Sequence, residues 1–306
     1  MKRLFCLILS IILVLLLVGC GKTQNSKDSI SIVATAFPHY DFARQLTEGA
    51  EGVEIKMLIS PGSEVHTYEP TPSDILAISG CDLFIYTGGE SDTWVKEILK
   101  SSENTGMSVV SFMEICSPDG HEDKEHDHEH EYDEHVWTLP IMSEAICQQI
   151  ALELCRIDKK NEALYKANLE SYLEKLRELD KDFQSVMTDA KRDSIVVADR
   201  FPFYHMATHY KLKYHTAFPG CSSSTEPSAA TISSLSQMVK KEDIPYVFTI
   251  EFSNGKIAES VTEGTDAKIL TLHSCHNVSK EDFEKKITYY DLMRQNAENL
   301  RKALCE

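Results

Sequence analysis

Short apolar runs alternate with amphipathic segments along most of the chain. Eight such runs occur, four in each half: 31–35, 53–59, 82–86, 108–112, 194–198, 213–218, 246–250 and 268–272. Segments with helical spacing of apolar residues lie between several of them, for example 41–47 and 229–239. Strands that alternate with helices are typical of parallel sheets covered by helices. The pattern therefore predicts an α/β protein with two lobes, each built on a four-stranded parallel sheet flanked by helices.

A long amphipathic segment lies between the two halves, from Asp158 to about Met187. Its apolar residues recur at steps of three and four, and no Gly or Pro interrupts them. This spacing predicts one helix, which at 1.5 Å per residue would reach roughly 45 Å. We interpret residues 158–190 as a rigid helix that joins an N-terminal lobe (30–157) to a C-terminal lobe (191–306). The alternative is an ordinary helix within one domain.

The N-terminus has the layout of a secretory signal. Lys2 and Arg3 precede an apolar run at 4–18, which is too short for a confident membrane span. The run ends in Leu17-Val18-Gly19-Cys20, which is similar to a bacterial lipobox. We therefore expect residues 1–19 to be removed, Cys20 to be lipidated, and 20–29 to form a tether at the cell membrane, outside the cytoplasm. The alternative is an uncleaved anchor helix.

Charge and cysteine usage narrow the classes of function. The formal net charge is −17, which excludes binding to nucleic acid through a general basic surface. The nine cysteines are scattered and do not form the pattern of a disulfide scaffold.

Three histidines follow predicted strands. His66 lies in the loop after the second strand, His135 beyond the fourth, and His273 directly after the last. Glu251 and Asp199 also follow strands of the second half. Ligands of open parallel sheets bind beyond the carboxyl ends of the strands, so these side chains are expected to converge. Imidazole suits zinc, copper, nickel and iron, whereas oxygen-rich sites suit manganese. The pattern indicates a metal site.

Two of these loops carry a family resemblance. The segment from Pro61-Gly62 to Pro70 and the segment His135-Val136-Trp137 resemble the first two ligand loops of the cluster A-I substrate-binding proteins of ABC transporters. The resemblance covers nearly the whole chain after the signal. It implies two α/β lobes joined by a rigid helix, zinc or manganese bound in the cleft, and a transporter permease as partner.

The sequence departs from this family at two ligand positions. Arg200 falls near the position where the family commonly has His or Glu, and a guanidinium cannot bind a cation. His273 falls where the family usually has Asp. The expected ligands are therefore His66, His135 and His273, with water or one carboxylate, from Glu251 or Asp199, as the fourth.

Two further pairs of residues leave alternatives open. Cys221 and Cys275 both follow strands of the second lobe, so they are expected to form a disulfide or, alternatively, to bind the metal as thiolates. His205 and His209 have the i,i+4 spacing of a chelating pair. Because they lie past the strand end, we interpret them as a solvated helix face.

An acidic segment immediately precedes His135. Residues 117–134 contain nine acids and four histidines, which are His121, His126, His128 and His130. Such a composition cannot form an apolar core and predicts disorder. We interpret it as a loop that collects metal weakly, a feature that goes with zinc in the family. The alternative is a solvated acidic loop with incidental histidines.

These observations predict a monomeric, non-enzymatic protein that captures zinc and delivers it to an ABC uptake transporter. A manganese-specific binding protein and a surface adhesin are the alternatives. A secreted zinc hydrolase is disfavoured, because the sequence lacks the His-Glu-x-x-His motif and the Gly-x-Ser-x-Gly nucleophile elbow.

Overall fold

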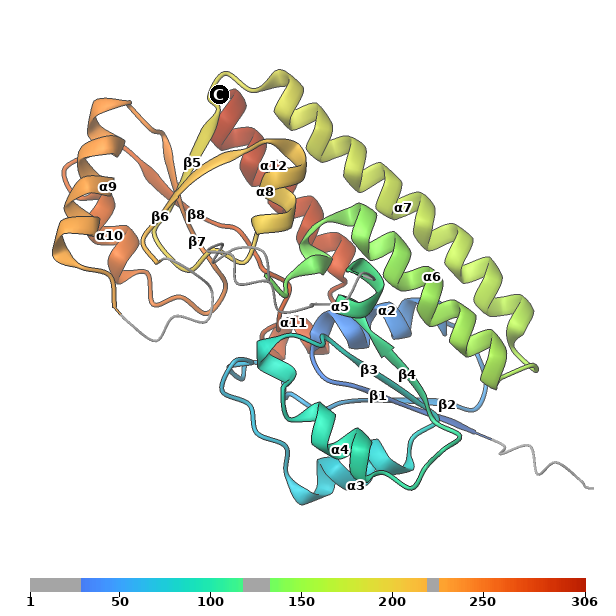
Figure 1. The fold of residues 1–306 in the computed structure, drawn as a ribbon. Helices are drawn as coiled ribbons and strands as arrows, with labels where there is room; N and C mark the ends of the chain where they lie inside the picture. Colours follow the sequence, from blue (N-terminus) through green and yellow to red (C-terminus); the bar gives the residue numbers. More distant parts are fainter. Residues whose placement is uncertain (1–28, 118–132, 219–225) are drawn as a thin grey trace, which may run out of the picture.

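The computed structural model describes residues 29–117, 133–218 and 226–306, and it contains two parallel sheets (Figure 1). The first has the order β2-β1-β3-β4 and the second the order β6-β5-β7-β8, with every neighbouring pair parallel. The strands are β1 (Ile30–Ala34), β2 (Val53–Met57), β3 (Leu83–Tyr86), β4 (Ser108–Ser111), β5 (Ser194–Val197), β6 (Lys213–Thr216), β7 (Tyr246–Thr249) and β8 (Lys268–Thr271). The predicted fold class, two four-stranded parallel sheets flanked by helices, is confirmed.

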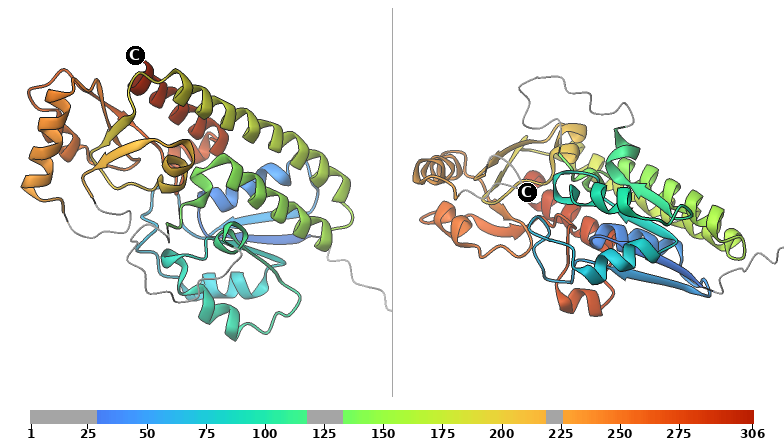
Figure 2. Two further views of the ribbon diagram at one scale, coloured as in Figure 1. Left: turned by 45° about the horizontal axis from the view of Figure 1, so that its top comes forward. Right: turned by 60° about the horizontal axis from the view of Figure 1, so that its bottom comes forward.

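Helices follow most of the strands in each half. In the first half they are α2 (Phe37–Leu46), α3 (Pro72–Gly80), η1 (Glu90–Asp92), α4 (Val95–Ser101), α5 (Phe112–Cys116), η2 (Val136–Thr138) and α6 (Pro140–Ile157). In the second half they are α8 (Tyr204–Tyr210), α9 (Ala229–Lys241), α10 (Lys256–Thr262), α11 (Lys280–Glu284) and α12 (Tyr289–Cys305). The strands end with their carboxyl ends facing the region between the two sheets, where the loops that follow them meet (Figures 1 and 2).

The long helix predicted between the halves is α7 (Glu162–Asp189), with 28 residues and a length of about 42 Å. One stripe of it is buried, and this stripe contains Tyr165, Tyr172, Leu173, Leu176, Leu179, Phe183 and Val186. The helix packs along α6 and α12, as all three views show (Figures 1 and 2). The helix therefore packs against a helix of each half of the chain.

The chain returns to the first half after β8. There the backbone N–H of Tyr289 donates to buried Asp41 at 2.6 Å, and Arg44 bridges Asp41 and the carbonyl of Ile287. The side-chain amide of Asn277 donates to two carbonyls of the loop after β2. One hydrophobic core accordingly includes residues of both sheets. The segment between β8 and α12 is thus a second connection between the lobes.

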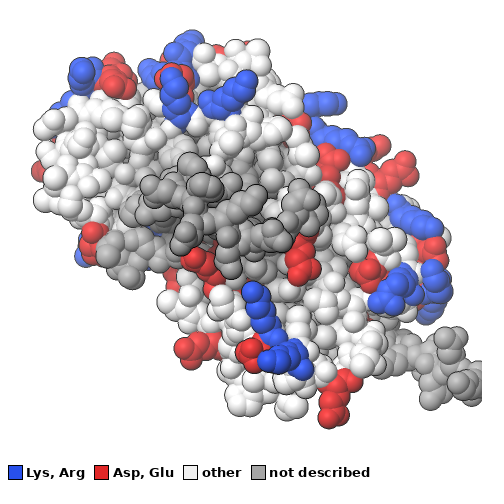
Figure 3. All heavy atoms as spheres, viewed as in Figure 1, with Lys and Arg blue, Asp and Glu red and all other residues white. Residues whose placement is uncertain are grey.

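Several predictions fall outside the described residues: the signal at 1–19, the lipidated Cys20, most of the tether, Cys221 and the histidines of the acidic loop. In the ranges that the structure describes, no helix combines the length and the apolar character needed to cross a membrane. Acidic and basic side chains are interspersed over the face shown in Figure 3.

Candidate metal centre

Three histidines from distant parts of the chain form one cluster. His66, His135 and His276 each offer a ring nitrogen, and these nitrogens lie within 4.8 Å of one another. The ring centroids are separated by 5.7 Å for His66 and His135, 4.8 Å for His66 and His276, and 4.9 Å for His135 and His276. His135 and His276 are buried, and His66 is partly buried. A cluster of convergent imidazoles is suited to a transition metal.

Trp137 fixes two of these histidines. It is fully buried in η2, two residues after His135, and its ring lies 4.9 Å from that of His276. Its indole N–H donates to the carbonyl of Ser274 at 2.9 Å, and its own carbonyl accepts from the Tyr289 hydroxyl at 2.6 Å. The segment that carries His276 is therefore attached to the segment that carries His135.

The loop that carries His66 is held by both halves of the chain. Gly62 adopts φ +80°, a conformation that favours glycine, and its N–H donates to the carbonyl of Val278. Asn277 donates to the carbonyls of Ser60 and Ser63, both at 2.9 Å. These bonds place His66 beside His276, one residue before Asn277.

Two adjacent carboxylates contact the rings of the cluster. Asp133 accepts from the backbone N–H of His135 at 2.9 Å and lies 3.0 Å from its Nδ1, and Glu134 lies 3.5 Å from Nδ1 of His66. Ser91 donates to Glu134 through its backbone and its hydroxyl. A carboxylate at Nδ1 fixes the tautomer and leaves Nε2 for a metal. The sequence placed Asp133 and Glu134 in a disordered loop, which is wrong for these two residues, since Glu134 is only 6% exposed.

Electrostatics at the cluster favour the neutral form of His276. Burial, followed by the neighbouring imidazoles of His135 and His66, holds the pKa of His276 well below its usual value. Burial opposes ionisation of Asp133, but His135 and its hydrogen bonds outweigh burial and lower the pKa of Asp133. The Nε2 atom of His276 is buried and has no hydrogen-bond partner among the described residues. An unsatisfied buried nitrogen is costly, and a bound metal would satisfy it.

His273, the third ligand expected from the sequence, lies outside this cluster. Its Nδ1 accepts from the backbone N–H of Cys275 at 2.9 Å and lies 3.7 Å from Glu251. Cys275 has φ +61°, so the chain turns there and brings His276 to the cluster instead. The His-Ser-Cys-His sequence offers two histidines, and only this turn distinguishes between them.

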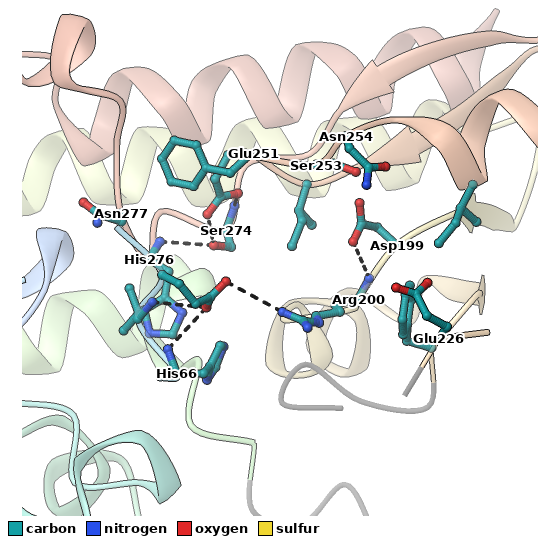
Figure 4. Close-up of a pocket in the computed structure, with 16 residues that line it drawn as sticks. His66, Asp199, Arg200, Glu226, Glu251, Ser253, Asn254, Ser274, His276 and Asn277 are labelled. Carbon is teal, nitrogen blue, oxygen red and sulfur yellow. Dashed lines mark hydrogen bonds and ion pairs between the residues drawn. The ribbon is translucent and has the colours of Figure 1, made fainter. Parts of the chain in front are cut away.

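The two candidate carboxylates line a cavity of about 270 Å³ beside His66 and His276 (Figure 4). Glu251 accepts from the backbone N–H of Ser274 at 2.7 Å and from its hydroxyl. Asp199 accepts from the backbone N–H of Arg200 at 2.9 Å. Neither carboxylate belongs to the cluster of His66, His135 and His276. As metal ligands, Glu251 and Asp199 therefore stay predictions.

Arg200 also lines this cavity and points across it (Figure 4). Its Nη1 lies 3.8 Å from the carboxylate of Glu64, which comes from the loop of His66. Arg200 therefore forms an ion pair between the two lobes at the edge of the cluster.

The Cys275 thiol is free among the residues that the structure describes, and its disulfide with Cys221 stays a prediction. Its side chain is fully buried in the hydrophobic core, and burial raises the pKa of the thiol well above its usual value. Its predicted partner Cys221 lies outside the described residues. A buried thiol in this environment is poorly suited to act as a thiolate ligand.

The two histidines of α8 differ from each other. His209 is exposed, as predicted, but His205 is mostly buried and its Nε2 donates to the backbone carbonyl of Asp133 at 2.6 Å. The interpretation of His205 as a solvated residue is wrong, because the segment before His135 covers it. His205 thus supports the residue that contacts His135.

The sequence is similar to a family model and to two relatives whose names refer to zinc. The sequence model described as ZnuA, zinc-uptake complex component A periplasmic, matches residues 32–303. The chain is 30% identical to the high-affinity zinc uptake system protein ZnuA of Bacillus subtilis over 95% of this chain and 94% of that protein. It is also 30% identical to the zinc-binding protein AdcA of Streptococcus pyogenes, over 92% of this chain but only 57% of that longer relative.

A solved structure has the same fold. The zinc-bound ZnuA-like domain of Streptococcus pneumoniae AdcA matches with a TM-score of 0.75 and 25% identity, over 91% of this chain and 100% of that chain.

Proposed function

We propose, since the chain belongs to the ZnuA family of periplasmic zinc-uptake components, that it captures zinc outside the cytoplasm at His66, His135 and His276. The observation that carries this proposal is the convergence of three ring nitrogens within 4.8 Å, one of them buried without a partner. The captured ion is then delivered to an ABC uptake transporter. This role requires binding and release and no chemical step.

The donor set favours zinc over manganese. All three clustered donors are imidazole nitrogens, and the Irving–Williams order also places zinc above manganese. Three protein ligands leave one position of a tetrahedral zinc ion for a further ligand. Glu251 and Asp199 remain candidates from the chain, together with water.

The proposed anchor and partners rest on the sequence. Lipidation at Cys20 would hold the protein, as a monomer, at the outer face of the membrane, near the transporter permease. Residues His121, His126, His128 and His130 would collect zinc weakly before it reaches the cluster. Cys20→Ala should release the protein from the membrane fraction, and unchanged retention would contradict the anchor.

A competition titration with a chromophoric zinc chelator tests the proposed function. The wild-type protein should bind one zinc ion tightly, and His276→Ala should abolish that tight site. His273→Ala is the matched control, because it removes an imidazole that is three residues away and lies outside the cluster. The zinc affinity of this variant should stay close to that of the wild type. Retained tight binding in His276→Ala, or its loss in His273→Ala, would contradict the proposed site.

A further inference from the structure

The cavity beside the histidine cluster is shared by both lobes. Glu64 and His66 line it from the first lobe, and Asp199, Arg200 and Glu251 from the second (Figure 4). Its volume is about 270 Å³, which is large enough for several water molecules. The open coordination position of a metal on the three histidines therefore adjoins space for a small molecule.

Arg200 is the cation that lines this space. A guanidinium has five N–H donors, and it binds carboxylates through two parallel bonds. Its ion pair with Glu64 is 3.8 Å long, beyond the 3.2 Å limit of an ordinary hydrogen bond, and the side chain is 31% exposed. Glu64 is itself 53% exposed, so this contact is weak and leaves the guanidinium donors accessible.

Three of the four carboxylates that line the cavity already accept hydrogen bonds, and the fourth, Glu226, is exposed. Glu251 accepts two hydrogen bonds from Ser274, and Asp199 accepts from the backbone of Arg200. Glu64 accepts from the backbone N–H groups of Val65 and His66 through its other oxygen. A metal ion held by three uncharged imidazoles would share this cavity with a guanidinium, and an anion between the two cations would be attracted to both.

We propose that an external small carboxylate occupies the fourth coordination position, with one oxygen on the metal and the other on Arg200. This inference rests on the proposed function and names the form of its cargo: a zinc ion together with a small carboxylate anion. Arg200, which cannot be a metal ligand itself, then contributes to binding through the anion.

Cobalt(II) provides a spectroscopic test, because its visible absorption reports a change of ligand directly. The cobalt-loaded full chain is titrated with acetate in a carboxylate-free buffer, with perchlorate at equal ionic strength as the control anion. Acetate should shift the absorption bands saturably, and perchlorate should not. Arg200→Gln should still bind one cobalt ion but should weaken the acetate response at least tenfold, and Arg200→Lys, which keeps the charge without the planar fork, should retain part of it.

Three results would overturn the proposal. The first is a cobalt spectrum that does not respond to acetate in the wild type, and the second is an Arg200→Gln response equal to wild type. The third is a cobalt spectrum altered by Glu251→Gln, Asp199→Asn or Glu64→Gln without acetate, because the fourth ligand would then come from the chain. Failure to bind cobalt or zinc at all would instead contradict the proposed function, so the two failures are distinguishable.

Discussion

The Nδ1 atom of His135 lies 3.0 Å from a carboxylate oxygen of Asp133, which also accepts the backbone N–H of His135. The same aspartate is held by His205 of α8, through a 2.6 Å bond to its carbonyl. A residue of the second lobe thus supports the orientation of a histidine in the first. This arrangement fixes the ring before any metal arrives.

Asp133→Asn should weaken zinc binding by about 10–100-fold, because the neutral amide no longer stabilises the Nδ1–H tautomer of a metal-bound His135. The matched control is Asp193→Asn, which changes an exposed aspartate paired with Lys213 at the far end of the second sheet. Chelator competition measures both affinities. Equal affinities for the two variants would show that Asp133 does not orient the metal site.

Asp41 attaches the returning C-terminal segment to α2. Its side chain is fully buried, and it accepts from the backbone N–H of Tyr289 and from Arg44. Asp41→Ala leaves Arg44 partly buried without its partner, so the free energy of unfolding should fall by about 3–5 kcal/mol.

Urea unfolding measures this change. The control is Asp189→Ala, which breaks the exposed pair with Arg301 and should cost no more than about 1 kcal/mol. A loss of similar size in the two variants would mean that Asp41 has no special role in the second connection between the lobes.

His39 should make the fold sensitive to acid. Complete burial, only partly offset by the N–H of Ala36, lowers the pKa of His39 from 6.5 to about 3. Since the folded pKa lies below the unfolded one, the stability contributed by this residue is fully present above pH 6.5. It is lost as the pH falls from 6.5 towards 3, because only the unfolded chain takes up the proton.

Between pH 7 and pH 5 this loss amounts to about 2 kcal/mol. It is measured as the difference between wild type and His39→Gln in urea unfolding at the two pH values, since other titrating groups are common to both proteins. A difference that does not depend on pH would contradict the linkage to His39.

Much of the fold follows from local sequence patterns. Each predicted apolar run became one strand, and a central strand such as Leu83–Tyr86 is buried on both faces of its parallel sheet. The linking helix was equally evident, since its buried stripe has uninterrupted helical spacing. Position after a strand selected His66 and His135, which belong to the cluster, but it also selected His273, which lies outside the cluster.

The remaining residues of the site depend on long-range contacts. His276 replaces His273 in the cluster because Cys275 has a positive φ and Asn277 is bound to the loop after β2, more than 200 residues earlier. Asp133 belongs to a stretch whose composition predicts disorder, but in the structure it is bonded to His135 and His205. Neither feature can be recognised from residue spacing.

The proton count of zinc binding provides a further test of the cluster. A metal binds an imidazole only in its unprotonated form, so zinc competes with protons as the pH falls. Burial holds the pKa of His276 well below 6.5, so this ring takes up its proton at a lower pH than an ordinary imidazole does. Fewer than three protons should therefore be released per zinc ion, and the logarithm of the affinity should fall by less than three per pH unit between pH 6.5 and 5. Chelator competition across this range, together with proton release measured by an indicator dye in weak buffer, gives the count.

Circular dichroism at pH 5 must show that the chain is still folded, because His39 reduces its stability there. A count of three protons would mean that His276 is accessible to solvent in the metal-free protein, which contradicts the buried cluster described above.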